Sequence, residues 1–210
     1  MTIASVIGDP ISFLDRAFAR ALALGIDIDD FDQIDHMCYR TSSIEEYKSL
    51  LRTLTCTAAA TADNNSSSSA LGFILVESMI GGRPIAIVEL YSAICYKGKY
   101  RIKHIEVPSP KAGSPYESGL EHLEVVLGEP GKRDPIDSRE ALLAFAQQAQ
   151  ARNPLLRLGL KAIDKHVNAD VSLDLDDRTT IKFHICPIEE VVRLEKEMNL
   201  AEAVPSEFYA

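Results

Sequence analysis

The chain has few cysteines, and they are widely spaced, at Cys38, Cys56, Cys95 and Cys186. No two of them form a C-x-x-C pair, so the sequence offers no disulfide framework. Closed structural zinc sites favour several closely spaced cysteines, which makes a purely structural metal the least favoured interpretation. This cysteine usage is typical of a protein from a reducing compartment.

Long apolar runs, basic excess and nucleotide-binding motifs are also missing. No apolar run approaches the roughly 18 residues that span a bilayer, and the N-terminus lacks a secretory-type apolar core. A net charge of −9 argues against a nucleic-acid partner. The sequence contains no G-x-G-x-x-G, P-loop or G-x-S-x-G motif. We therefore expect a cytoplasmic protein with neither a membrane nor a nucleic-acid partner.

What the chain does contain is one order of elements that occurs twice. Hydrophobic periodicity, capping residues and turn residues predict the elements. In the first half they are a helix at 11–24, a strand at 33–40, a helix that begins after Ser42 and Ser43, and strands at 71–80, 84–91 and 100–107. In the second half they are a strand at 120–127, a helix from Asp137 to 149, strands at 156–162, 171–175 and 179–184, and a last helix at 188–198.

Each half thus has the order strand, helix, strand, strand, strand. The repeat predicts a single α+β domain over residues 1–210, with two paired βαβββ modules that form a curved mixed sheet around a cleft, and helices outside. Residues 1–30 hold an extra N-terminal helix, 31–110 the first module, and 111–210 the second module with a C-terminal helix. The Ser- and Ala-rich stretch at 56–70 cannot bury enough apolar area to offset its ordering entropy, so we expect a flexible surface insertion there.

Three histidines, His36, His122 and His184, lie on strand-like runs. Because side chains alternate along a strand, each histidine shares a face with polar neighbours, and the larger apolar residues lie opposite. A single histidine in such a place is most often a solvent-facing polar residue. Three of them, each on a run that also carries charged residues, favour a metal site in a concave sheet.

Two glutamates and two basic residues accompany these histidines. Glu106 ends the last strand of the first half and would complete a mixed nitrogen and oxygen set for Zn²⁺, Fe²⁺, Ni²⁺ or Mn²⁺. Glu124 could be a ligand, a partner that orients an imidazole, or a general base. Arg40 and Lys182 could bind a substrate carboxylate or simply balance Glu124. Cys38 fits better as a small core residue than as a ligand.

These segments resemble the bacterial YecM family. The matching segments are DHMCYR at 35–40, GRPI at 82–85, IEVP at 105–108, GLEHLE at 119–124 and TTIKFH at 179–184. The resemblance covers nearly the whole chain after the first helix and implies membership of the vicinal-oxygen-chelate superfamily, which includes glyoxalase I, extradiol dioxygenases and bleomycin-resistance proteins. That superfamily is built from paired βαβββ modules, as the repeat predicts.

The resemblance also implies a ligand set, because superfamily metalloenzymes take ligands from the first and last strands of each module. By position these are His36, Glu106, His122 and His184, with His184 where a glutamate is usual. A metal-dependent isomerase, lyase or dioxygenase would follow, with Glu124 moving a proton and a small substrate chelating the ion through two adjacent oxygens. The alternative is a non-catalytic binding protein of the bleomycin-resistance type. Either could be a monomer or a homodimer.

Overall fold

The computed structural model describes residues 1–56, 70–113, 116–127, 139–165, 167–176 and 178–209. The insertion expected at 56–70 therefore lies, from residue 57 to 69, outside the described residues, as does the helix cap expected at Asp137. Among the helices that the structure describes, none has both the length and the apolar character needed to cross a membrane.

The doubled order of elements is confirmed. The first half contains α1 (Ala4–Ile7), α2 (Pro10–Ala23), η1 (Ile28–Asp30), β1 (Gln33–Arg40), α3 (Ile44–Thr55), β2 (Gly72–Ile80), β3 (Arg83–Tyr96) and β4 (Tyr100–Pro108). The second half contains β5 (Gly119–Val126), α4 (Arg139–Arg152), β6 (Gly159–Ala162), β7 (Asp170–Asp174), β8 (Thr180–His184), α5 (Ile188–Glu197) and η2 (Ser206–Tyr209).

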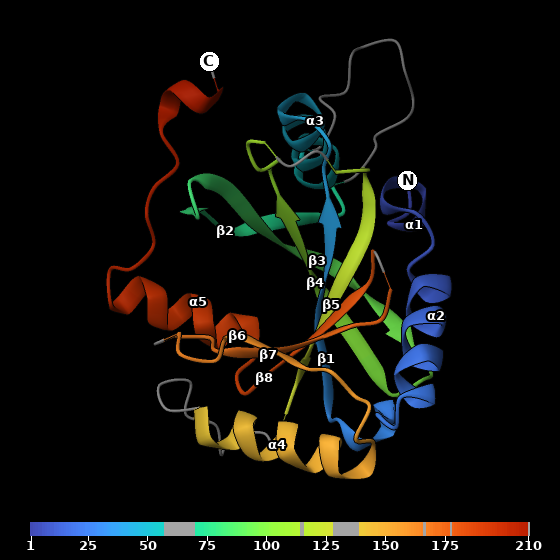
Figure 1. Cartoon of the computed structure of the whole chain (residues 1–210). Helices are drawn as coiled ribbons and strands as arrows, with labels where there is room; N and C mark the ends of the chain where they lie inside the picture. Colours follow the sequence, from blue (N-terminus) through green and yellow to red (C-terminus); the bar gives the residue numbers. More distant parts are fainter. Residues whose placement is uncertain (57–69, 114–115, 128–138, 166, 177, 210) are drawn as a thin grey trace.

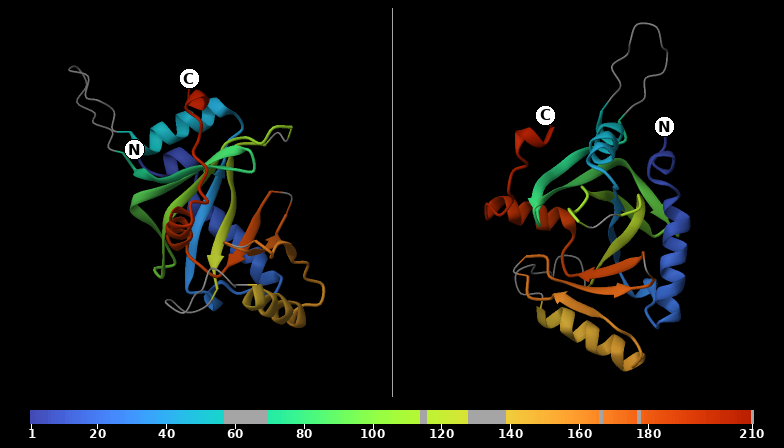
Figure 2. Two further views of the ribbon diagram at one scale, coloured as in Figure 1. Left: turned by 90° about the vertical axis from the view of Figure 1, so that its left-hand side faces the viewer. Right: turned by 45° about the horizontal axis from the view of Figure 1, so that its top comes forward.

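All of these strands belong to one curved mixed sheet (Figures 1 and 2). The strand order is β2-β3-β4-β1-β5-β8-β7-β6, so β1 and β5 lie side by side at the centre. They are antiparallel to each other, while β1 is parallel to β4 and β5 is parallel to β8. Exchanging β1 with β5 therefore maps each half of the sheet onto the other half.

Local signals explain where several elements begin and end. Ser43 caps α3 by accepting a hydrogen bond from the Glu46 amide, and the Glu46 carboxylate accepts one from the Ser42 amide. Gly81 and Gly82 join β2 to β3 with φ angles of +59° and +79°, the left-handed conformation that glycine adopts without a Cβ clash.

The helices divide between the two faces of the sheet. Ala86 and Val88 of β3 belong to the main core with α2 and α3, whereas Ile87 between them faces the other way. Ile87 packs against the apolar side of α5, formed by Ile188, Val191 and Val192. The last helix thus covers the inner face of the curved sheet, where it also forms one wall of the candidate site.

Candidate functional site

Two irregularities at the centre of the sheet shape the site. The β1–β5 register passes from Ile34 to His36, so Asp35 has no partner in the ladder, and on β5 it passes over Glu121 in the same way. An extra residue in a strand re-aims neighbouring side chains. Each acid therefore turns toward the ring of the histidine that follows it, instead of pointing to the opposite face.

The resulting acid–histidine contacts are short in both halves. Asp35 Oδ2 lies 2.9 Å from His36 Nδ1, and Glu121 Oε2 lies 2.6 Å from His122 Nδ1. An ionised carboxylate can only accept here, so both rings carry a proton on Nδ1, and Nε2 is the atom that each ring presents to Glu106 and Glu124. This is how carboxylates orient metal-ligating imidazoles in proteins.

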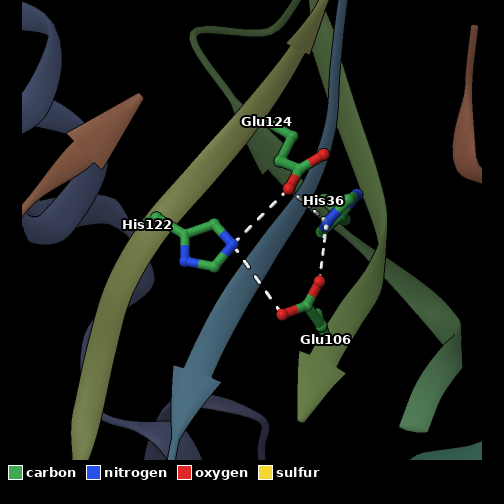
Figure 3. Close-up of side chains that lie close together, drawn as sticks. All are labelled: His36, Glu106, His122 and Glu124. Carbon is green, nitrogen blue, oxygen red and sulfur yellow. Dashed lines mark ion pairs between the residues drawn. The ribbon is translucent and has the colours of Figure 1, made fainter. Parts of the chain in front are cut away.

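Four side chains converge between the central strands (Figure 3). His36, Glu106, His122 and Glu124 each offer one ligand atom, and these atoms all lie within 4.8 Å of one another. His36 Nε2 is 3.7 Å from Glu106 and 3.6 Å from Glu124, and the matching distances for His122 Nε2 are 3.8 and 3.5 Å. Donors around a tetrahedral zinc ion are separated by about 3.4 Å, so the group is slightly open but correctly sized.

The electrostatics of this group favour a cation. His36 is 1% exposed, and its Nε2 atom has no hydrogen-bond partner among the described residues. Burial alone would lower the pKa of His36, but the charge of Glu124 and the contacts with Asp35 and Glu106 outweigh it and raise the pKa well above its usual value. Two carboxylates in a buried pocket thus stabilise positive charge at this ring.

The two carboxylates themselves stay ionised. Burial raises the pKa of Glu106, but the His36 contact and the charges of His122 and Lys182 outweigh burial, so the pKa of Glu106 is lowered below its usual value. Burial also raises the pKa of Glu124, but the charge of Lys182 and then that of His36 outweigh burial. The pKa of Glu124 is therefore well below its usual value. Both carboxylates are therefore available as ligands at neutral pH.

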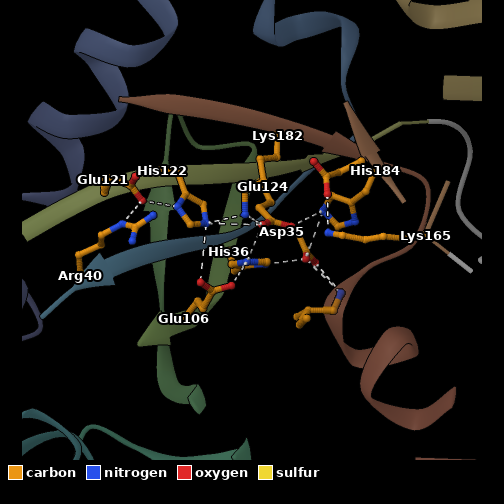
Figure 4. Close-up of polar contacts among 12 residues, drawn as sticks. Asp35, His36, Arg40, Glu106, Glu121, His122, Glu124, Lys165, Lys182 and His184 are labelled. Atoms are coloured by element: carbon orange, nitrogen blue, oxygen red, sulfur yellow. Dashed lines mark hydrogen bonds and ion pairs between the residues drawn. The ribbon is translucent and has the colours of Figure 1, made fainter. Parts of the chain in front are cut away.

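His184, expected as the fourth ligand, lies beside this group and outside it. Its fully buried ring stands 6.3 Å from the His36 ring, centroid to centroid. His184 Nε2 is 3.6 Å from both Asp35 Oδ2 and Glu124 Oε2 (Figure 4). Glu124, expected as a general base, takes the fourth place in the converging group.

The two basic residues expected to bind substrate both line the cavity next to the site. Lys182 Nζ donates to Glu124 Oε1 at 2.7 Å and to His122 Nε2 at 3.0 Å, and the first contact is the one that a role in balancing Glu124 requires. Arg40 Nε lies 2.8 Å from Glu121 Oε2, and its guanidinium stacks on the Tyr116 ring at 4.2 Å.

The cavity has a volume of about 500 Å³ and combines a polar end with an apolar wall. Ile85 and Ile87 of β3, with Ile188 and Val192 of α5, form that wall. The sequence predicted the helix at 188–198, but not its place at the wall of the cavity. It also gave no role to Arg83, whose Nη1 donates to the Ser109 carbonyl at 2.6 Å beside the cavity. Arg83 belongs to the GRPI segment at 82–85, one of the segments that carry the family resemblance.

Comparisons with known proteins agree with the sequence motifs. The family model described as YecM protein matches residues 2–195. Protein YecM of Escherichia coli (strain K12) is 30% identical over 126 residues, 60% of this chain, and the match spans 65% of the E. coli protein's own length. A solved structure described as Structural Genomics, Protein EC4020 is 27% identical, covers 92% of this chain and 91% of its own, and has a TM-score of 0.63.

A more distant solved structure is the Q60A variant of Streptomyces coelicolor methylmalonyl-CoA epimerase in complex with 2-nitronate-propionyl-CoA. It is 10% identical, covers 73% of this chain and 97% of its own, and has a TM-score of 0.40, too low to bear on the site. The family assignment rests on the match over residues 2–195. The chain belongs to the YecM family.

Proposed function

We propose that the chain binds a divalent transition-metal ion through His36, Glu106 and His122, with Glu124 as a fourth donor, and acts on a small oxygen-chelating molecule. The observation that carries this proposal is the Nε2 atom of His36. It is buried and has no hydrogen-bond partner within the described residues, yet the Nδ1 contact with Asp35 orients it toward two carboxylates. Two imidazoles and two carboxylates suit zinc, nickel, iron or manganese.

A divalent ion bound there would act as a Lewis acid toward two adjacent oxygens of a substrate. The chain's own groups would do the remaining work. The apolar wall from Ile87 and Ile188 limits access of water, and Arg40 and Arg83 offer positive charge to a substrate carboxylate. Glu124 is the group that we assign to proton transfer, because its carboxylate is ionised and borders the cavity. Isomerase, lyase and dioxygenase reactions share these requirements.

The experiment is metal analysis of protein purified without a histidine tag. We expect roughly one transition-metal ion per chain, or stoichiometric uptake of Zn²⁺, Ni²⁺, Mn²⁺ or Fe²⁺ after treatment with a chelator. The double substitution His36→Ala and His122→Ala should abolish uptake. His104→Ala is the matched control, because His104 is also buried in the sheet and its Nε2 atom likewise has no hydrogen-bond partner among the described residues, but it lies outside the group.

A second candidate is a metal-free protein that binds and sequesters a small molecule in the same cavity. The contact between Lys182 Nζ and His122 Nε2 favours it, because this hydrogen bond uses the lone pair that a metal would need. Under this function the folded protein contains no transition metal and takes up none of the four ions. That result would overturn the metal proposal, and circular dichroism would establish that the protein is folded.

A further inference from the structure

The register of the sheet gives Lys182 a defined place in the symmetry of the site. Across the parallel pair β1–β4, Cys38 stands opposite Glu106, and across the parallel pair β5–β8, Glu124 stands opposite Lys182. The antiparallel pair β1–β5 relates His36 to Glu124 in the same way as it relates His122 to Cys38. The exchange of halves that maps His36 onto His122 therefore maps Cys38 onto Glu124. It also maps Glu106, which stands opposite Cys38, onto Lys182, which stands opposite Glu124.

Lys182 thus occupies the position where a fully symmetric site would carry a second carboxylate in the role of Glu106. Its side chain is 28% exposed and reaches into the group, to 2.7 Å from Glu124 Oε1 and 3.0 Å from His122 Nε2. Two of the four candidate donor groups are already bound to this one ammonium. An ammonium can only donate, so it binds the same lone pair of His122 that would hold a metal.

Lys182 carries its positive charge throughout the neutral range. Burial would lower the pKa of Lys182, but the charges of Glu124 and Glu106 outweigh burial and raise it. Both carboxylates therefore have a permanent internal counter-charge. A divalent ion would have to displace the ammonium from His122 and Glu124, and would then be repelled by it at close range.

We propose that Lys182 is an internal cation at the position where a symmetric site would carry a second carboxylate, and that it sets the affinity for divalent metal ions. This inference rests on the proposed metal centre, whose residues it shares. Lys182 acts on the metal through His122 and Glu124, so it is a positioning residue for the centre. Its removal should free the His122 lone pair and leave Glu124 without its counter-charge, which raises the affinity of the site for a dication.

The experiment measures Zn²⁺ and Mn²⁺ binding to the chelator-treated full chain by calorimetry and by competition with a chromophoric chelator, at one fixed neutral pH for all variants. Lys182→Met should bind at least about tenfold more tightly than the natural chain. Lys182→Glu should bind more tightly still, because it supplies the carboxylate that the symmetry lacks. It should also show the larger rise in melting temperature on zinc addition.

Lys165→Met is the matched control. Lys165 lines the same cavity and pairs with Asp170 at 2.8 Å, so the substitution removes an equal charge without touching the candidate donors. Its zinc affinity should stay within about twofold of the natural chain, because its charge is 55% exposed and screened by water. A rise as large as that of Lys182→Met would overturn the inference, because general cavity charge would then explain the effect.

The outcomes separate this inference from the proposed function. Metal binding by the natural chain, tightened in the Lys182 variants, supports both. Binding by the variants alone supports the inference and overturns metal binding by the natural chain. Equal affinity in the natural chain and in folded variants overturns the inference and leaves the metal centre intact. Absence of binding throughout overturns both. Lys182→Gln, which retains a donor to Glu124, serves the same comparison if the methionine and glutamate variants do not fold.

Discussion

The two halves of the site build the same acid–histidine unit with different supports. In the first half, Asp35 is buried with no exposed side-chain surface, and both of its oxygens accept from the amide of Ile188 at the start of α5. In the second half, the Glu121 side chain is 25% exposed and pairs with Arg40. One histidine is therefore oriented by the tertiary structure, and the other by an ion pair at the edge of the cavity.

The largest expected effect is on stability and comes from the first half. Asp35→Ala leaves the buried amide of Ile188 and the Nδ1 atom of His36 without an acceptor. We expect a loss of about 3 kcal/mol in the free energy of unfolding, because unsatisfied buried polar groups keep their full desolvation cost. Urea denaturation of the chelator-treated protein measures it.

The corresponding change in the second half is Glu121→Ala. Because this carboxylate is partly solvated, we expect a loss of only about 1 kcal/mol. Equal losses for the two alanine variants would show that the different surroundings of Asp35 and Glu121 have no energetic consequence, and the comparison between the halves would then fail.

An effect smaller than that of Asp35→Ala is expected on metal affinity. Glu121→Gln keeps the size of the side chain but removes the charge that holds His122, so zinc affinity should fall about tenfold, as it does when outer carboxylates are removed from metal-bound histidines. Competition with a chromophoric chelator measures this change, and circular dichroism checks the fold. An affinity within about twofold of the natural chain would indicate that His122 is oriented without help from Glu121.

Local signals in the sequence were enough to predict most of the fold. The Ser43 cap, the Gly81–Gly82 turn and the alternation along β1 and β5 depend on residues close together in the chain, and the elements that they predict are present. As expected, His36, Glu106 and His122 lie close together, because β4 and β5 both border β1. The repeated order of elements predicts that these strands are neighbours.

The remaining features depend on pairing between distant segments. Strict alternation would put Asp35 and Glu121 on the face opposite their histidines. Only the interruptions of the β1–β5 ladder let these two side chains contact the histidine rings. Whether Lys182 or His184 stands opposite Glu124 is decided by the register of β8, which no local pattern specifies. The apolar side of α5 could equally have packed on the outer face of the sheet.

The smallest expected effect is the pH dependence of the Glu121 contribution. Burial raises the pKa of Glu121, but hydrogen bonds from His122 and Arg40 outweigh it and lower the pKa to about 2, from a usual value of 4.5. A lowered pKa means that the folded state favours the ionised form, so the stabilisation is complete above pH 4.5 and is lost as the pH falls toward 2.

The stability gap between the natural chain and Glu121→Gln, about 1 kcal/mol at neutral pH, should therefore stay constant down to about pH 5 and narrow below that. Urea unfolding of the chelator-treated proteins at several pH values measures the gap. A gap that does not narrow between pH 4.5 and 2 would mean that the ionised carboxylate does not stabilise the second half, and that His122 is held by the surrounding strands alone.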